Sequence, residues 1–423
     1  MRIVIMAVGS RGDVQPYLAL GIGLRCAGYE VRIATHAEFR EFVAGRGLEF
    51  AAIEGNPRQM METDAGKMWL ASGRNPIQFM RGFMTLAKPI AERLLATSWT
   101  ACQGADAVVF STIGFTGYHV AEKLGIPSIS APLQPLTPTR RFPGVGTQPH
   151  PRLGGAYNWL SHVVYQQAFW QLLRPYINPW RRDVLKLKPM PWNGPYTRIA
   201  RERLPFVYGY SPLVAPKPPD WGEWIHVCGY WFLDETETYQ PPGDLIDFLQ
   251  SGPPPVYVGF GSMIHRDPAR VAEMVVKALA IAKQRGILLA GWAGLNHGNL
   301  PDHVFQIDAA PHDWLFPRMA AVVHHGGAGT TAAGLRAGVP SIVAPFFADQ
   351  GFWGERVHAL GVGPKPIPQK QVTVERLAEA IRVAVNDQAM RVRAADLGRR
   401  IRAEDGVARA VEAIQEHLAM GRG

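Results

Sequence analysis

The sequence predicts an α/β protein with two parallel, doubly wound sheets in two domains of similar size. In both halves of the chain, short apolar stretches alternate with helical segments, as expected of parallel strands joined by crossover helices. A proline-rich stretch at 211–220 interrupts this alternation and is typical of a stiff linker. The length of 423 residues allows two or three domains of roughly 150 residues each. We therefore expect one domain at 1–214, a second at 215–404 and a final helical segment at 405–423.

The predicted elements follow this alternation. In the first domain, strand 2–8 passes through a turn into helix 14–27, where Pro16 lies in the first turn and sacrifices no hydrogen bond. In the second domain, a buried strand beginning near Ala320 leads through a glycine-rich turn into a helix that starts near Ala328. The other predicted strands are 31–35, 50–53, 107–111, 128–131, 256–260, 287–291, 304–307 and 341–344, and the other helices are 37–45, 118–124, 269–284 and 407–419.

The composition indicates a well-packed protein without membrane-spanning helices. Apolar residues make up 47% and charged residues 19%, which argues against disorder. Cys26, Cys102 and Cys228 are too few and too scattered for a disulfide framework or a metal cluster. No apolar run approaches the ~18 residues of a spanning helix, and the N-terminus resembles a first strand more than a signal peptide. We expect a cytoplasmic protein.

The net charge of +9 and the pI near 9.5 favour anionic partners. Nucleotide phosphates and an anionic membrane surface fit this charge, and peripheral membrane contact is therefore an open alternative. Nucleic acid is not expected, because no motif that reads RNA or DNA is present. Much of the excess charge lies in arginines near the C-terminus, where a solvated helix face is the simpler interpretation: Arg391, Arg393, Arg399, Arg400 and Arg402.

Two apolar stretches interrupt the strand–helix alternation. Five methionines lie between Met60 and Met84, together with Trp69, Phe79 and Phe83. A second stretch, 157–180, is apolar nearly all round and has basic residues within it and after it. Either stretch suits core packing between helices. An acceptor pocket or a membrane-facing surface is an equally good interpretation, since methionine adapts to varied apolar shapes and basic residues beside aromatics suit an interface.

The glycine-rich turn after the predicted strand is the clearest candidate site. His324 and His325 are followed by Gly326-Gly327-Ala328-Gly329-Thr330 at a helix start. Converging backbone N–H groups and the positive end of the helix dipole would suit a phosphate or diphosphate. The next strand leads to Asp349 and Gln350, at the carboxyl edge where ligands of parallel sheets bind.

Other cofactor motifs are not matched. The stretch from Gly259 begins like a dinucleotide-binding loop but has Ile264 where the third glycine belongs. No stretch has the spacing of a Walker loop or of a zinc site. His324 and His325 are neighbours and would point to opposite faces of a strand, so a two-histidine metal site is not expected. We predict no cofactor and no metal.

Four segments in matching order resemble the sterol glucosyltransferases and their bacterial relatives. They are Gly9-Ser10-Arg11-Gly12-Asp13-Val14-Gln15-Pro16, the stretch 310–315, His324 to Thr331, and Ala344 to Gln350. Members of that family are inverting, nucleotide-sugar-dependent enzymes with the GT-B fold. The resemblance implies two facing Rossmann-like domains with a cleft between them, and a C-terminal helix that packs back on the N-terminal domain.

The resemblance also implies a role for each residue of these motifs. Asp13 corresponds to the general base, although a carboxylate there could equally cap the helix expected from Val14. His325 corresponds to the diphosphate-binding histidine, supported by backbone N–H groups of the helix start. The other donor-binding positions are Ser10 and Arg11 across the cleft, Ala328, Gly329 and Thr330 at the diphosphate, Asp349 and Gln350 at the sugar hydroxyls, and Ala310 and His312 at the base and ribose.

Two further donor contacts are suggested by position alone. Ser262 follows the first strand of the second domain and could reach a phosphate, and Trp292 could stack on a base. A tryptophan beside a buried strand is more often part of the core. Plant small-molecule glucosyltransferases carry a glutamate where this chain has Ala333, so the choice between UDP and TDP stays open.

The resemblance implies transfer of glucose from UDP-glucose to a hydroxyl of a sterol-like or other apolar lipid. The alternative is an NDP-sugar glycosyltransferase acting on a macrolide, polyketide or glycopeptide aglycone. Two readings from other classes are a nucleotide-sugar epimerase and a non-catalytic sensor of nucleotide sugars. The fungal sterol enzymes carry long N-terminal extensions, so we expect the resemblance to cover their catalytic part.

Overall fold

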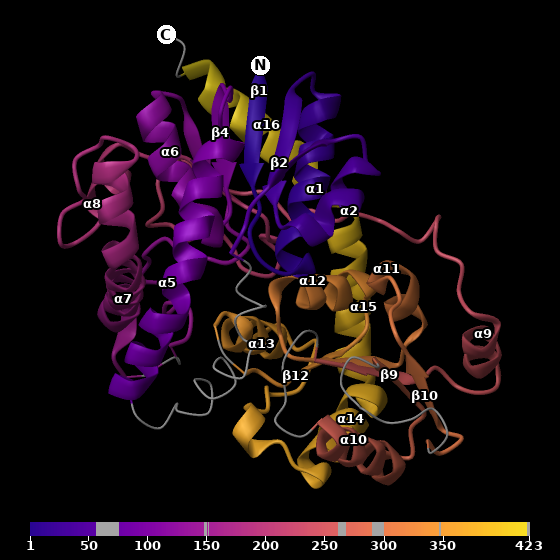
Figure 1. Ribbon diagram of the computed structural model, residues 1–423. Helices are drawn as coiled ribbons and strands as arrows, with labels where there is room; N and C mark the ends of the chain where they lie inside the picture. Colours follow the sequence, from indigo (N-terminus) through magenta and orange to yellow (C-terminus); the bar gives the residue numbers. More distant parts are fainter. Residues whose placement is uncertain are drawn as a thin grey trace. The chain divides into compact units, whose positions relative to one another are not determined.

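A computed structural model describes residues 1–55, 76–147, 150, 152–260, 268–289, 300–346 and 348–420, with the backbone alone for 76–87 and 268. The chain forms two compact units (Figure 1). Unit 1 comprises Met1–Gly209, Lys217–Leu233 and Gly406–Gly423, and unit 2 comprises Tyr210–Pro216 and Asp234–Asp405.

Unit 1 is built on a seven-stranded sheet in which every strand pair is parallel. β1 and β4 lie next to each other and are almost completely buried, because helices cover both faces of the sheet. The strand order is β3 (Glu49–Ala52), β2 (Glu30–Thr35), β1 (Arg2–Met6), β4 (Ala107–Phe110), β5 (Ser128–Ser130), β6 (Phe206–Tyr208) and β7 (Ile225–Val227).

Helices of unit 1 pack on both faces of its sheet, because successive side chains of each strand point to opposite faces. α1 (Arg11–Cys26) packs on one face, where Gly21 approaches Val31 and Ile33. α6 (Thr116–Leu124) packs on the other face, where Gly117 approaches Met6. The remaining helices are α2 (Arg40–Ala44), α5 (Pro76–Ala101), α7 (Gly154–Asp183) and α8 (Tyr196–Arg201), and a 3-10 turn at Ala37–Phe39 precedes α2.

Unit 2 repeats the architecture with a five-stranded parallel sheet. The order is β10 (Val304–Ile307), β9 (Gly286–Leu289), β8 (Val256–Gly259), β11 (Ala321–His324) and β12 (Ser341–Val343). Its helices are α9 (Gly243–Gln250), α10 (Pro268–Ala282), α11 (His312–Leu315), α12 (Ala328–Ala337), α13 (Gln350–Ala359), α14 (Val374–Asn386) and α15 (Gln388–Arg402). The predicted fold class of two parallel α/β domains is confirmed.

The course of the chain between the units differs from the expected boundary after Val214. The chain enters unit 2 at Tyr210–Pro216, returns to unit 1 for Lys217–Leu233 and leaves it again at Asp234. The return occurs because β7, which lies beyond the proline-rich stretch, pairs with β6 at the edge of the first sheet. The prolines therefore lie where the chain passes from one unit to the other and back, and the first sheet gains its last strand, β7, after them.

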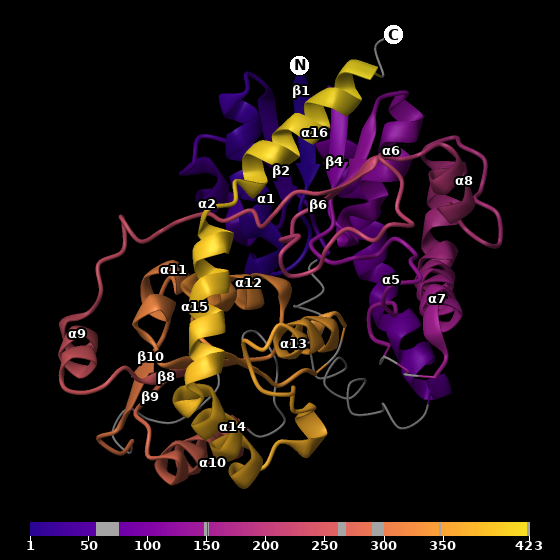
Figure 2. The same cartoon turned by 180° about the vertical axis from the view of Figure 1, so that it is seen from behind.

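The last helix, α16 (Gly406–Met420), belongs to unit 1 as predicted and lies across its sheet (Figure 2). It packs against α1, where a Cβ built on Gly23 would lie 2.4 Å from Val407 Cγ1. Gly406 at its start approaches the backbone of Gly229 and Tyr230, beyond β7. Absence of a side chain at these two glycines allows the close packing. None of the helices in the described part of the chain is both long and apolar enough to cross a bilayer.

Candidate functional site

The glycine-rich turn of unit 2 follows β11 as the sequence predicts. His324 ends the strand with no exposed surface, and its Nδ1 accepts a hydrogen bond from the Gly326 N–H at 3.0 Å. Gly326 has a φ of +90°, which favours glycine. The histidine that closes the turn is thus His324. His325 does not take that structural role.

His325 packs against the turn that follows it. A Cβ built on Gly327 would lie 2.5 Å from His325 Nε2, so glycine at 327 leaves room for the imidazole. Gly327 is the N-cap of α12, whose first turn presents Ala328 and Thr330 half-buried and Gly329 exposed. The first N–H groups of a helix lack partners within it and carry its positive dipole end. The turn therefore offers an imidazole beside backbone donors, as an anion site requires.

His325 is neutral at pH 7 in this setting. Burial lowers its pKa to about 4, because the charged ring would lose its hydration. Its Nδ1 is buried and has no hydrogen-bond partner among the residues that the structure describes. A neutral imidazole can still donate one hydrogen bond to a phosphate oxygen. A bound diphosphate would also favour the charged form and raise this pKa.

The segment at 310–312 follows β10 and runs into the first residue of α11. Pro311 is the N-cap of α11, and Ala310 and His312 are half-buried. The His312 ring stacks on Phe316 at 4.2 Å between centroids and meets Tyr257 edge-on at 6.0 Å. These contacts fix the ring of His312. They leave the ribose-and-base role as a prediction.

Asp349 and Gln350 hold the loop between β12 and α13. Asp349 is the N-cap of α13, but its side chain makes no capping bond, and Oδ2 accepts from the Trp353 indole N–H at 2.8 Å. Gln350 is 5% exposed, and its Oε1 accepts from the Phe346 N–H at 2.8 Å. The Asp349 carboxylate therefore does not cap α13. Contact of either residue with a sugar stays a prediction.

In unit 1, Asp13 lies inside α1, so the expected helix start at Val14 was wrong. α1 begins at Arg11, with Ser10 as N-cap and Asp13 as its third residue. Asp13 Oδ2 accepts from the Ser10 backbone N–H and from the Ser10 hydroxyl, both at 2.8 Å. A carboxylate at this position reaches back to the N-cap, as in a capping box. Asp13 thus caps the helix from within.

The pKa of Asp13 is raised above its usual range. Burial raises it, and this outweighs the hydrogen bonds from Ser10 and the positive charge of His36, which both lower it. Capping alone would lower the pKa of Asp13 and weaken it as a base. The raised pKa instead makes the carboxylate a better proton acceptor near neutral pH. Both hydrogen bonds from Ser10 fall on Oδ2.

The predicted donor-binding residues belong to both units of the chain. Ser10 and Arg11 are with Asp13 in unit 1, where the exposed Arg11 bonds Gln15 Oε1 at 3.3 Å and lies 4.9 Å from the Phe42 ring. His325 and the other described donor positions are in unit 2. Ser262, Trp292 and the methionines Met60, Met61 and Met68 lie outside the described residues, and at Met80 and Met84 only the backbone is described.

Two residues beside these positions were not singled out from sequence. His36 follows β2 at the carboxyl edge of the first sheet, and the same strand-end signal that pointed to Asp349 could have found it. Trp353 is completely buried on α13 and binds Asp349. Within the described ranges, no three His, Cys, Asp or Glu side chains are grouped as a metal site would need.

Two family models match the chain in the order of its two units. Residues 3–143 match the glycosyltransferase family 28 N-terminal domain. Residues 287–416 match the C-terminal domain of erythromycin biosynthesis protein CIII-like proteins. The second match runs from β9 into α16 and includes the turn at His325 and the loop at Asp349.

The chain is also similar over its whole length to curated fungal proteins. It is 39% identical over 444 residues to the sterol 3-beta-glucosyltransferase of Cryptococcus neoformans var. neoformans serotype D, covering 99% of this chain and 27% of that protein. It is 40% identical over 430 residues to the sterol 3-beta-glucosyltransferase of Aspergillus terreus, covering 99% and 30%. The chain thus spans less than a third of the length of these relatives.

Solved structures share the architecture at low sequence identity. The glycotransferase of kitacinnamycin matches with a TM-score of 0.70 at 20% identity, over 99% of both chains. The Streptomyces sp. SF2575 glycosyltransferase SsfS6, complexed with thymidine diphosphate, matches with a TM-score of 0.60 at 21% identity, over 98% of this chain and 99% of that one. Such identities show the fold alone. Together with the matched domains, they show a GT-B fold with glycosyltransferase domains, in a chain that is similar along its whole length to sterol glucosyltransferases.

Proposed function

We propose that the protein is an inverting glycosyltransferase that moves glucose from UDP-glucose to a hydroxyl of a sterol-like or other apolar lipid. The observation that carries this proposal is the 39–40% identity to sterol 3-beta-glucosyltransferases over 99% of the chain. The solved glycosyltransferases named above share only 20–21% identity. Transfer to a macrolide or polyketide aglycone is therefore the second candidate.

In the proposed reaction, Asp13 takes the proton of the acceptor hydroxyl. The hydroxyl oxygen bonds to the anomeric carbon of glucose from the face opposite the diphosphate, and the bond from that carbon to the diphosphate oxygen breaks. The raised pKa of Asp13 suits the proton transfer.

The leaving UDP gains negative charge as the bond breaks. His325 and the N–H groups at the start of α12 would stabilise this charge through preorganised donors, usually a large catalytic term. Asp349 and Gln350 would contact sugar hydroxyls, and Ala310 and His312 the nucleoside. Ser10 and Arg11 would contact the donor from unit 1.

The first experiment tests transfer and acceptor class together. Purified protein is incubated with UDP-glucose and separate sterol and macrolide panels, with products read by mass spectrometry. We expect sterol glucoside formation. Turnover of macrolides alone would end the sterol assignment, and consumption of UDP-glucose without any acceptor would favour an epimerase.

Replacement of the base separates catalysis from donor binding. Asp13→Asn should reduce transfer on the order of 10²- to 10⁴-fold while UDP binding, measured by thermal shift, persists. A non-catalytic sensor would instead show no transfer in the wild type and the same UDP binding in both proteins. Full transfer by Asp13→Asn would show that another group is the base.

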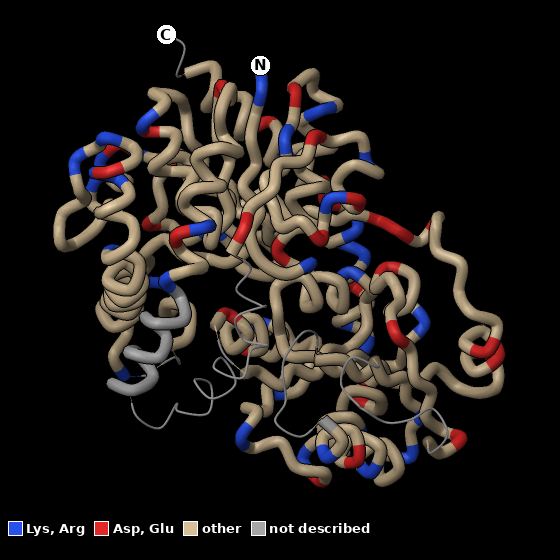
Figure 3. The backbone as a smooth tube through the Cα atoms, in the orientation of Figure 1, with Lys and Arg blue, Asp and Glu red and all other residues tan. Residues whose placement is uncertain are grey.

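We also propose that unit 1 contacts an anionic membrane through α7. Residues 154–173 of this helix contain no Asp, Glu, Lys or Arg and form an uncharged stretch in Figure 3. Leu153, Leu160 and Val164, which share a helix face, are 52%, 54% and 58% exposed. Exposed Arg140 and Arg141 lie beside this stretch, where Asn158 Nδ2 donates to the Arg140 carbonyl at 3.0 Å. Cations beside an apolar stripe suit the headgroup region of an anionic bilayer.

Vesicle binding tests this surface. The protein should sediment with phosphatidylserine-containing vesicles, and the double variant Leu160→Asp and Val164→Asp should lose this binding while its transfer to a detergent-dispersed sterol persists. Val392→Asp, at a position 57% exposed in unit 2, is the matched control and should bind like the wild type. Equal sedimentation of all three proteins would exclude α7 as the contact.

A further inference from the structure

His36 has an unusual hydrogen-bonding state at the carboxyl edge of the first sheet. It follows β2, is 3% exposed, and its Nδ1 lies 2.9 Å from the Ile53 carbonyl oxygen. Since a carbonyl oxygen can only accept, Nδ1 carries the proton and donates it. In the neutral ring Nε2 then bears a lone pair. Nε2 is buried and has no hydrogen-bond partner within the described part of the chain.

The position of His36 in the sheet brings it level with the turn that carries Asp13. β1 and β2 pair in parallel with Met6 opposite Ala34, and the Ala7 N–H donates to the Ala34 carbonyl at 3.0 Å. If this register is extended by two residues, Val8, which precedes Gly9, lies opposite His36. The Asp13 carboxylate lies against Gly9, since a Cβ built there would be 2.5 Å from Asp13 Oδ2.

The two side chains also interact electrostatically. A positive charge on His36 lowers the pKa of Asp13, and among the described residues no other charged side chain acts on it in this way. Tyr17, one turn further along α1, is also coupled to Asp13, and burial keeps its phenol neutral. Glu38 and Arg40, which follow His36 along the chain, are exposed to solvent.

We infer that His36 is a positioning residue that acts through Asp13, as the second member of a two-residue proton acceptor. The inference rests on the proposed transfer reaction. The acceptor hydroxyl gives its proton to Asp13 Oδ1 while its oxygen bonds to the anomeric carbon and the diphosphate leaves with the bonding electrons. The Asp13 O–H then passes this proton to His36 Nε2 after a side-chain rotation that brings the two atoms within hydrogen-bond distance, since no hydrogen bond joins them among the described residues. The carboxylate is restored beside an imidazolium that Ile53 holds through Nδ1–H.

Two substitutions of His36 separate this role from packing. His36→Asn keeps a side-chain N–H for the Ile53 carbonyl but has no atom at the Nε2 position. His36→Gln extends an amide toward that position but cannot take up a proton. We expect both variants to keep the KM for UDP-glucose and to lose at least tenfold in kcat. The acidic limb of kcat against pH should move to higher pH, because the pKa of Asp13 rises once the positive charge of His36 that lowers it is gone.

His162→Asn is the matched control. His162 is 2% exposed in unit 1 and also bonds a backbone carbonyl, that of Phe142, at 3.1 Å from Nε2. This variant should shift the melting temperature by a similar amount and leave kcat and its pH profile unchanged. A wild-type kcat and pH profile in His36→Asn would overturn the inference. An equal loss of kcat in His162→Asn would show that the effect of the His36 substitutions is one of packing, and would also overturn the inference.

A second readout does not depend on turnover. The Asp13 carboxyl can be titrated by NMR in protein labelled with ¹³C-aspartate, assigned with Asp13→Asn. We expect the pKa of Asp13 to rise in His36→Asn, because the imidazolium that lowers it is gone. An unchanged titration would refute the inference even if transfer is observed. Absence of transfer in the wild type, with the expected NMR shift, would refute the proposed function and leave the coupling of the two residues standing.

Discussion

Gly9 and Asp13 are fitted to one another at the start of α1. Gly9 has a φ of +140°, and a Cβ on it would lie 2.5 Å from Asp13 Oδ2 and 2.7 Å from Asp13 Cβ. Real side chains do not tolerate such distances, so the carboxylate occupies the space that a side chain at position 9 would fill. The glycine therefore allows the candidate base to turn back over the end of β1.

Gly9→Ala should therefore displace Asp13 as well as strain the backbone. We expect transfer to fall at least tenfold and the free energy of unfolding to fall by about 1–3 kcal/mol. Gly28→Ala is the control, because Gly28 also has a positive φ, of +91°, but no atom within 4 Å of a Cβ built there. It should lose similar stability in chemical denaturation and keep its kcat. Equal kcat losses in both variants would contradict the fit of Gly9 to Asp13.

Donor binding should couple to protonation of His325. Its pKa of about 4 in the free protein should rise when a diphosphate lies beside the ring, because the anion favours the imidazolium. Binding then takes up protons between the free and the bound pKa, so affinity for UDP-glucose should increase as the pH falls toward 5. Calorimetry in two buffers of different ionisation enthalpy measures this uptake. His325→Gln should bind more weakly and without proton uptake, and a pH-independent wild type would argue against diphosphate contact.

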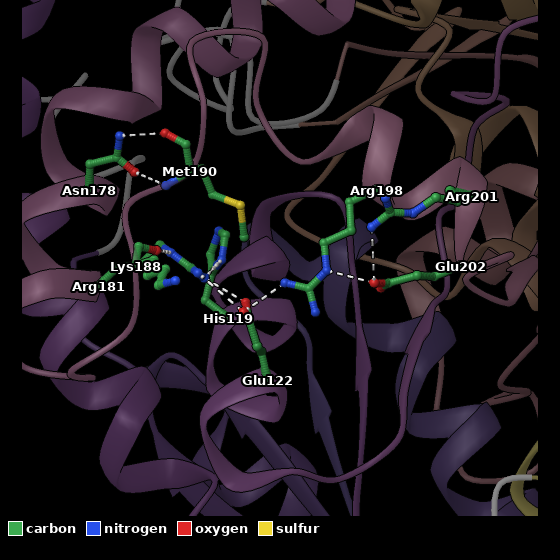
Figure 4. A network of polar contacts seen from close by, with 9 residues as sticks. All are labelled: His119, Glu122, Asn178, Arg181, Lys188, Met190, Arg198, Arg201 and Glu202. Atoms are coloured by element: carbon green, nitrogen blue, oxygen red, sulfur yellow. Dashed lines mark hydrogen bonds and ion pairs between the residues drawn. The ribbon is translucent and has the colours of Figure 1, made fainter.

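A buried arginine network should stabilise unit 1 (Figure 4). Arg181, 2% exposed, donates from NH1 to Glu122 Oε2 at 2.7 Å and to His119 Nδ1 at 2.8 Å. Arg198 donates to the other oxygen of Glu122 at 2.7 Å. Glu122 thus joins α6 to α7 and α8, and its pKa is lowered by these hydrogen bonds despite burial, which raises it.

Glu122→Gln should leave the Arg181 charge buried without its counter-ion. We expect a loss on the order of 3 kcal/mol in the free energy of unfolding, the scale for breaking a buried pair. Arg182→Gln removes the neighbouring arginine, which pairs with Asp183 in solvent, and should hardly change the melting temperature. Since the folded state depresses the pKa of Glu122, its stabilisation is present above a pH of about 4.5 and is lost as the pH falls below it. Equal melting temperatures for both variants would contradict the network.

The sequence was enough to predict the strands of both sheets except β6 and β7, and the motif at His325, because strand and turn signals are local. Strand 304–307 was placed exactly where it is found, whereas helix 14–27 begins three residues earlier, at Arg11. The error arose because Asp13 was taken as an N-cap preceding the helix. An aspartate three residues into a helix gives the same local signal when the N-cap is Ser10.

Long-range contacts were beyond sequence reasoning. Nothing near Asp349 indicates that its carboxylate binds the Trp353 indole, a contact that depends on the fold of α13. The pairing of β7 with β6 was missed because it follows a proline-rich stretch typical of a linker. The net direction of the pKa of Asp13 was also open, since burial outweighs the hydrogen bonds from Ser10 only once the helices pack.

Acid should loosen the packing of α16 on unit 1. His417 of α16 meets His226 of β7 edge-on at 5.4 Å between ring centroids. Burial lowers the pKa of both rings. The charge of His226 lowers the pKa of His417 further, and the charge of Lys217 lowers that of His226 further. The carboxylate of Glu416 raises the pKa of both rings and so partly opposes these effects. Because the folded state disfavours protonation, the stabilisation is present above the ordinary histidine pKa of about 6.5 and is lost as the pH falls through the lowered values.

Amide hydrogen exchange measures this loosening helix by helix. Between pH 7.5 and pH 5, exchange in 406–420, corrected for its intrinsic pH dependence, should accelerate more than exchange in β1, because protonating both rings places two positive charges side by side. His417→Gln cannot acquire that charge and should lose most of the acceleration, whereas His150→Gln, at an exposed site, should retain it. If α16 of the wild type and of His417→Gln respond equally to acid, the two histidines do not control the docking of this helix.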